Sequence, residues 1–197
     1  MRYDGMRTKK RQLGFTMIEL LVAIAVLAFM ASIAIPGFSR WLPNYRLRSA
    51  ARDLYSNMQL AKMGAVRNNT DWAIVFDSGV TPGRYFICSD DNGDGWDGAP
   101  AMGGNDGVEK TVDLSNYESG VDYGHGNATD DIPGNGAPPA DDITYGSDVA
   151  VFNPRGTGSG GYVYLENNEN TTTYAIGTRT SGVILLRKWS SSTNNWE

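Results

Sequence analysis

The sequence contains a single cysteine, Cys88, and a single histidine, His125, among its 197 residues. One cysteine excludes an intramolecular disulfide, and a lone thiol is more often a small core residue than a nucleophile. His125 has no second His or Cys with which to complete a zinc-type site. Nothing in the sequence points to a Ser-His-Asp arrangement either. We therefore expect no catalytic residues and no enzymatic activity.

Charged residues are also nearly absent between residues 15 and 35, where Glu19 is the only one. An apolar run of about 20 residues is long enough to cross a bilayer as a helix. The residues just before it are basic at four positions, Arg7, Lys9, Lys10 and Arg11. Because basic residues keep the adjacent end of a first span in the cytoplasm, we expect a transmembrane helix over 15–36 with a cytoplasmic N-terminus.

The carboxylate of Glu19 distinguishes this run from simpler apolar segments. Burying a carboxylate in a span costs about 2.5–3.5 kcal/mol on insertion scales, so such groups indicate function. A secretory signal peptide would also have a basic start and an apolar core, with Ala31 and Ala34 as a candidate cleavage site, but its core is shorter. A plain membrane anchor accounts for the length and leaves Glu19 unexplained.

The segment Gly14-Phe15-Thr16-Met17-Ile18-Glu19 closely resembles the processing site of type IV pilins and type II secretion pseudopilins. This resemblance implies that prepilin peptidase removes residues 1–14 as a leader, cutting between Gly14 and Phe15, and that Phe15 is then N-methylated. Glu19 would lie one helical turn from the new amine. The resemblance implies that Glu19 pairs with the amine of a neighbouring subunit during assembly; its own amine is the alternative partner.

Removing residues 1–14 makes the remaining chain strongly acidic. The leader holds five basic residues and one acidic residue, which leaves 12 basic and 21 acidic residues and a net charge of −9. Since nucleic-acid binding depends on neutralising phosphates with Lys and Arg, this balance disfavours a nucleic-acid partner.

An amphipathic pattern follows, and it predicts a helix over 37–70. Apolar residues recur at spacings of three and four, at Leu47, Ala50, Ala51, Leu54, Met58, Ala61 and Ala65. Pro36 is expected to kink or locally melt the chain between this helix and the apolar run, and Asn44 is a plausible N-cap for a second helix.

Residues 71–197 are predicted to form a β-rich domain. Short apolar runs separated by turn residues indicate an antiparallel sheet, with strands expected at 72–76, 84–88, 108–114, 150–152, 162–165, 173–176 and 183–186. Two Gly/Asp-rich stretches, 89–107 and 119–148, are expected to be loops. The predicted class is therefore α+β and pilin-like, with a long N-terminal helix packed on an antiparallel β-sheet.

The C-terminal strands narrow the resemblance to the GspH/FimT group of minor pseudopilins. The matching segments are Phe152-Asn153-Pro154-Arg155-Gly156-Thr157, Tyr162-Val163-Tyr164-Leu165, Tyr174-Ala175-Ile176 and Gly182-Val183-Ile184-Leu185. The resemblance implies a structural subunit of a type II secretion pseudopilus, anchored in the inner membrane with a periplasmic domain. Its expected partners are other pseudopilins, the peptidase and the inner-membrane assembly platform. A minor pilin of a type IV pilus, serving adhesion, twitching or DNA uptake, stays open, as does a membrane-anchored enzyme.

One loop motif has the chemistry of a cation site. Asp90, Asn92 and Asp94 at alternate positions, followed by Gly95, match the opening half of an EF-hand calcium loop. The twelfth position is Ala101 instead of Glu, so a further ligand would have to come from Asp97, Asp106 or a backbone carbonyl. The predicted Ca²⁺ ligands are Asp90, Asn92, Asp94 and Asp97. A solvated acidic loop that binds no metal is the alternative.

Three basic residues lie near the C-terminus, Arg179, Arg187 and Lys188, and such residues are the ones that contact nucleic-acid phosphates. Some FimT-like pilins bind DNA through a Gly-Arg-x-Arg motif in the last hairpin. Here the corresponding residues are Gly182-Val183-Ile184-Leu185, without the arginines. We therefore expect no nucleic-acid site.

Overall fold

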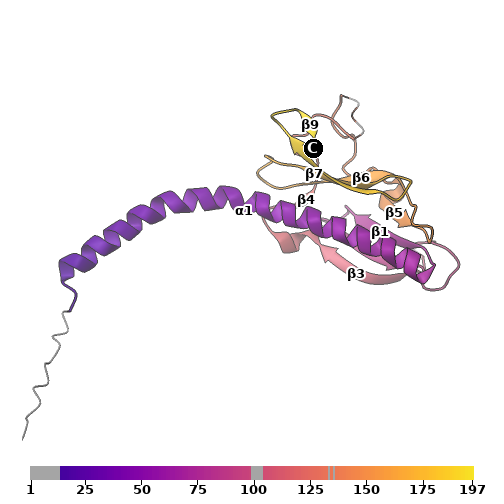
Figure 1. Ribbon diagram of the computed structural model, residues 1–197, viewed down its shortest axis with the longest axis horizontal. Helices are drawn as coiled ribbons and strands as arrows, with labels where there is room; N and C mark the ends of the chain where they lie inside the picture. Colours follow the sequence, from indigo (N-terminus) through magenta and orange to yellow (C-terminus); the bar gives the residue numbers. More distant parts are fainter. Residues whose placement is uncertain (1–13, 99–103, 133, 135) are drawn as a thin grey trace, which may run out of the picture. The chain divides into compact units, whose positions relative to one another are not determined.

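The computed structural model describes residues 14–98, 104–132, 134 and 136–197, and for residues 34–40 the backbone alone (Figure 1). Except for Gly14, the predicted leader 1–14 lies outside the described residues. The chain divides into two compact units, Met1–Arg40 and Trp41–Glu197.

The first element is one helix, α1 (Met17–Asn68). Its residues up to Ile33 are exposed on every face, as expected for an apolar helix whose cover must come from outside the chain. Within the described parts of the chain, we find no helix that is both long and apolar enough to cross a membrane.

The helix does not end and restart at Pro36, so of the kink or local melting expected there, the melting is wrong. Continuing a helix past a proline loses one hydrogen bond, whereas starting a second helix requires a costly new nucleus. Asn44 accordingly lies inside α1 and is no N-cap. Its side-chain oxygen instead accepts hydrogen bonds from Asn167 (3.2 Å) and Thr171 (3.3 Å).

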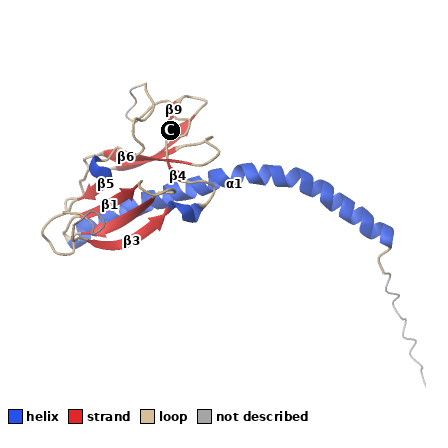
Figure 2. Cartoon of the chain, turned by 180° about the vertical axis from the view of Figure 1, so that it is seen from behind, coloured by secondary structure: helices blue, strands red, loops and turns tan. Residues whose placement is uncertain are grey.

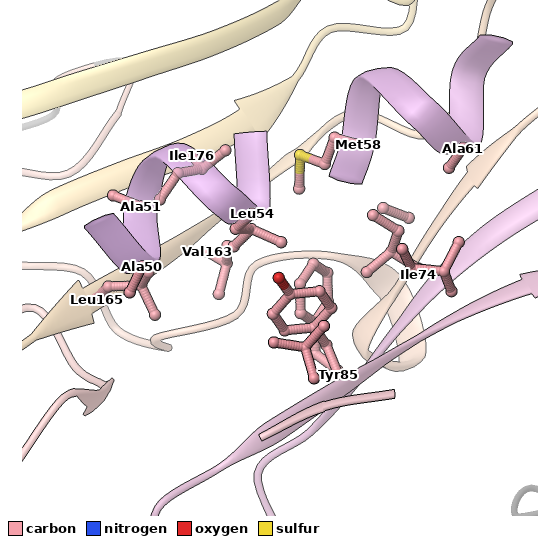
Figure 3. Close-up of a cluster of buried hydrophobic side chains, with 14 of the residues drawn as sticks. Ala50, Ala51, Leu54, Met58, Ala61, Ile74, Tyr85, Val163, Leu165 and Ile176 are labelled. Atoms are coloured by element: carbon pink, nitrogen blue, oxygen red, sulfur yellow. The ribbon is translucent and has the colours of Figure 1, made fainter. Parts of the chain in front are cut away.

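The second half of α1 supplies the central part of the domain core. All the residues of the predicted apolar stripe are buried, at most 1% exposed, which confirms the helical period read from the sequence. Figure 3 shows Ala50, Leu54 and Met58 directed toward side chains that come from several strands. The helix therefore packs against the β-structure along one face.

The β-structure consists of two antiparallel sheets (Figure 2). The first has the order β3-β2-β1-β5, with β1 (Trp72–Asp77), β2 (Arg84–Ser89), β3 (Gly107–Asp113) and β5 (Val149–Phe152). The second has the order β4-β6-β7-β8-β9, with β4 (Asp122–Tyr123), β6 (Gly161–Glu166), β7 (Tyr174–Thr178), β8 (Ile184–Ser190) and β9 (Asn195–Trp196). The predicted α+β class with an antiparallel β-domain is confirmed.

Alternation along β1 gives the first sheet two apolar faces. Ile74 and Phe76 join the main core with α1, whereas Ala73 and Val75 join a smaller cluster on the opposite face. Cys88 belongs to that smaller cluster, is fully buried and has a free thiol. The single cysteine is thus a small core residue, as the sequence suggested.

The 119–148 stretch is held to the domain by a few apolar anchors, among them Val121, Ile143 and Tyr145, which are buried in the main core. It contains β4 and ends in a short 3-10 turn, η3 (Gly146–Asp148); a similar turn, η2 (Leu114–Tyr117), follows β3. Ile143 also forms an isolated bridge with Val163 of β6. The loop therefore follows the second sheet even though its sequence is poor in large apolar residues.

Candidate functional site

The start of α1 is closed by a reciprocal pair of hydrogen bonds between Thr16 and Glu19. The backbone N–H of Glu19 donates to the Thr16 hydroxyl (3.2 Å), and the backbone N–H of Thr16 donates to the Glu19 carboxylate (3.5 Å). Thr-x-x-Glu at this position is a capping box, which satisfies two N–H groups that the helix itself cannot bond. Glu19 therefore has a local role in the helix end.

The predicted processing residues lie directly before this cap. Gly14 and Phe15 are exposed, precede the first helical residue, Met17, and leave the capping pair on the C-terminal side of the predicted cut. Cleavage between them would leave the capping box in the mature chain. Processing at this bond stays a prediction.

The acidic loop begins where β2 ends and closes where β3 begins. In the antiparallel pairing of these strands Ser89 is opposite Gly107, so Asp90 and Asp106 come from the same end of the pair. One carboxylate oxygen from each of Asp90, Asp94 and Asp106 lies within 4.8 Å of the other two. Three carboxylates so close together repel one another unless a proton or a cation neutralises them.

Asp90 organises the first turn of the loop. It is 4% exposed, and its two carboxylate oxygens accept hydrogen bonds from the backbone N–H groups of Gly93 (2.6 Å) and Gly95 (3.1 Å). Gly93 and Gly95 have φ angles of 78° and 95°, which side-chain-bearing residues seldom adopt. The glycines thus allow the loop to curl around the Asp90 carboxylate.

Asp106 is the most buried carboxylate of the group, at 0% exposed. Its Oδ2 accepts hydrogen bonds from the N–H groups of Asp97 (3.0 Å) and Gly98 (2.9 Å), whereas its Oδ1 is buried and has no hydrogen-bond partner in the described structure. Burial raises the pKa of the Asp106 carboxyl above its ordinary value, an effect that the two N–H donors oppose.

The other two predicted ligands have different roles. Asp97 is absent from the three-carboxylate cluster, and its Oδ1 accepts a hydrogen bond from Asn105 N–H (3.2 Å). Asn92 donates hydrogen bonds to Asp94 (3.2 Å) and to the Asn105 side chain (2.9 Å). The cluster thus lacks Asp97 and contains Asp106, which lies 16 residues beyond Asp90 and was one of the further ligands that the sequence allowed.

Trp96 ties this loop to the sheet. Its partly buried ring packs against the small cluster around Ala73, Val75 and Cys88. Burial of an aromatic ring contributes a large apolar contact, so Trp96 holds the loop against the outer face of the first sheet and fixes the position of Asp94 and Asp97 on either side of it.

The basic residues near the C-terminus line two hollows, and Arg187 contributes to both. Arg179 and Arg187 line a hollow of about 450 Å³ together with Asp130 and Asp131, so opposite charges face the same space. Lys188 lines a second hollow, of about 320 Å³, together with Arg187 and with Arg48 and Arg52 of α1. The sequence alone did not indicate that Arg48 and Arg52 of α1 lie close to the C-terminal strand β8.

Two family models match the chain, one at its N-terminus and one over most of the domain. A family model for the prokaryotic N-terminal methylation motif matches residues 9–35, and a family model for the type II transport protein GspH matches residues 50–182. No curated protein and no solved structure matches the chain. The first match contains Gly14, Phe15 and Glu19; the second contains the acidic loop and most of the strands.

Proposed function

Because the chain belongs to the GspH family of type II transport proteins, we propose that it is a minor pseudopilin of a type II secretion system. Its role is structural: it joins a short periplasmic filament that supports protein export across the outer membrane. The observation that carries this proposal is the presence, in one chain, of an N-terminal methylation motif and a GspH domain.

Maturation follows from the first of these features. We propose that prepilin peptidase cuts between Gly14 and Phe15, that Phe15 is methylated, and that the segment 15–36 holds the protein in the inner membrane until it is extracted into the filament. The exposed apolar side chains up to Ile33 support this, because they need either lipid or neighbouring helices as cover.

Assembly uses the same helix. In a filament, apolar helices pack side by side, and the carboxylate of Glu19 needs a charged or hydrogen-bonded partner once water is excluded. The amine of Phe15 on a neighbouring subunit is the proposed partner. Other pseudopilins and the inner-membrane assembly platform are the proposed contacts of the protein, and no catalytic step is assigned to it.

The test is the secreted-protein profile of a strain that lacks this chain. Exported proteins should accumulate in the periplasm, and a plasmid copy of the wild-type chain should release them. A copy carrying Gly14→Glu should fail to do so, since the leader would stay attached. A side chain at Gly14 would meet no described atom within 4 Å, so this variant leaves the folded domain undisturbed.

Unchanged secretion in the deletion strain would contradict the proposal. If surface filaments, twitching or DNA uptake were lost instead, the protein would be a minor pilin of a type IV pilus, which shares the N-terminal features.

A further inference from the structure

We propose that Asp90, Asp94 and Asp106 bind one Ca²⁺ ion at the base of the β2–β3 pair. This proposal goes beyond the role in the filament. The site lies within the β-rich domain and does not depend on whether a secretion system or a pilus machinery assembles the protein.

The strongest observation is that Asp106 is buried with one carboxylate oxygen unpaired in the described part of the chain. Its Oδ1 is fully buried, has no hydrogen-bond donor among the described residues, and belongs to a carboxylate that faces two others. A buried carboxylate oxygen without a partner is costly, and a cation bound between the three carboxylates would provide the missing partner. A loop whose acidic groups were merely solvated would leave Asp106 in water, whereas this residue is 0% exposed.

The remaining geometry is already arranged for such an ion. Asp90 holds its carboxylate in place through the N–H groups of Gly93 and Gly95, and each oxygen keeps a second lone pair for a cation. Asp106 is held in the same way by Asp97 and Gly98. Two of the three carboxylates are therefore fixed by backbone donors before the ion arrives, and the exposed Asp94 closes the site from the solvent side.

The donor set favours Ca²⁺ among divalent cations. All three groups offer carboxylate oxygens, which suit hard cations, and neither imidazole nor thiolate belongs to the cluster. Ca²⁺ accepts six to eight oxygens at about 2.3–2.6 Å in flexible geometry, so oxygens on opposite sides of the ion lie about 5 Å apart. That distance accommodates a spread of up to 4.8 Å. Mg²⁺ requires a tighter octahedron and gives up its water reluctantly.

The experiment uses the full chain in non-ionic detergent, stripped of metal with a chelator. Calorimetric titration with CaCl₂ should show saturable binding of one ion per chain, with a Kd at or below about 10⁻³ M, the weak end of known extracellular sites. Thermal unfolding of the domain should shift upward by several degrees in Ca²⁺. Mg²⁺ at equal concentration should bind at least tenfold more weakly.

Three single-charge variants make the test specific. Asp106→Asn keeps the side-chain shape and an oxygen for Asp97 and Gly98, and should lower Ca²⁺ affinity at least tenfold. Asp94→Asn changes an exposed ligand, so it tests the site even where a core substitution at 106 fails to fold. Asp91→Asn removes a charge from the same loop outside the cluster and should leave affinity within about twofold.

Absence of binding heat and of a thermal shift at 10 mM Ca²⁺, about ten times the weakest expected Kd, would overturn the proposal. So would equal responses from Asp94→Asn and Asp91→Asn, because binding would then reflect the general acidity of the loop. An equal response to Mg²⁺ would overturn the assignment to calcium.

Discussion

Asn57 donates a 2.7 Å hydrogen bond from its side-chain amide to the hydroxyl of Tyr85, inside the domain. Asn57 belongs to α1 and Tyr85 to β2, and both are buried. Lys110 of β3 donates in turn to the Asn57 side-chain oxygen (3.1 Å). These hydrogen bonds join the helix to two strands inside the domain, and removing the Asn57 amide or the Tyr85 hydroxyl leaves a buried polar group unpaired.

We predict that Asn57→Ala lowers the free energy of unfolding by about 1–3 kcal/mol, the cost of leaving a buried hydroxyl without a partner. Denaturant unfolding of the full chain in detergent, followed by tryptophan fluorescence, measures the change. Ser56→Ala is the control, because Ser56 is the exposed neighbour on the same helix and should change stability by less than about 0.5 kcal/mol. Equal effects of the two substitutions would contradict a role for the Asn57–Tyr85 contact.

The same contact predicts a loss of stability in alkali. Burial raises the pKa of Tyr85 to about 12, with the Asn57 hydrogen bond opposing the rise, whereas a tyrosine in the unfolded chain ionises near pH 10. The unfolded state therefore binds fewer protons than the native state above pH 10. The contribution of Tyr85 is fully present below pH 10 and is lost as the pH rises toward 12, by up to about 3 kcal/mol.

Unfolding midpoints at pH 9, 10 and 11 would measure this loss, and tyrosinate absorbance would report the ionisation itself. Burial also raises the pKa values of Tyr123 and Tyr145, so Tyr85→Phe should remove part of the slope and leave the rest. A slope that is unchanged in Tyr85→Phe would show that Tyr85 ionises as easily in the native state as in the unfolded one.

A close approach of α1 to β1 gives a second stability prediction. A Cβ on Gly64 would lie 2.6–2.8 Å from three ring atoms of Trp72. Alanine is a better helix former than glycine by about 1 kcal/mol, but overpacking of this kind costs about 1–3 kcal/mol. We predict that Gly64→Ala destabilises the domain and blue-shifts or quenches tryptophan emission. Met63→Ala, at an exposed site one residue away, is the control; stabilisation by Gly64→Ala would mean that Trp72 moves freely.

The helix stripe could be predicted because its information is local. Leu47, Leu54 and Met58 repeat with the helical period, and a period is visible in one segment without knowledge of its neighbours. Most strand positions were predictable for the same reason, although β4 and β9 were not predicted and β8 continues to Ser190, beyond the predicted end at residue 186. The division into two sheets was not, since it depends on which strands pair: β1 takes β5 as its second neighbour across about 70 residues, and nothing in either strand specifies that partner.

The acidic loop also depends in part on strand pairing, which local sequence does not reveal. The Asp90–Asp94 spacing was recognisable as a cation motif, and the structure keeps both residues together. Asp106 joins them only because strand register brings the end of β2 beside the start of β3. Asp97 was the nearer residue in sequence, but it is outside the three-carboxylate cluster, and its backbone N–H donates a hydrogen bond to Asp106.

The capping box at the start of α1 allows the last prediction to separate two roles of Glu19. We predict that Glu19→Ala leaves cleavage after Gly14 intact and blocks assembly, because the proposed ion pair with the amine of Phe15 is lost. Alanine also removes the hydrogen bond from Thr16 N–H, so this variant alone does not distinguish the charge from the cap.

Glu19→Gln and Thr16→Ala complete the comparison. Glutamine serves the capping box as well as glutamate does but has no charge, whereas Thr16→Ala removes the capping hydroxyl, at a cost of about 1 kcal/mol, and keeps the carboxylate. Immunoblots would follow cleavage, and recovery of the chain in sheared or cross-linked filaments would follow assembly. If Glu19→Gln fails to assemble while Thr16→Ala assembles normally, the charge of Glu19 is required. Normal assembly of Glu19→Gln would rule out the ion pair and leave helix capping as the function of Glu19.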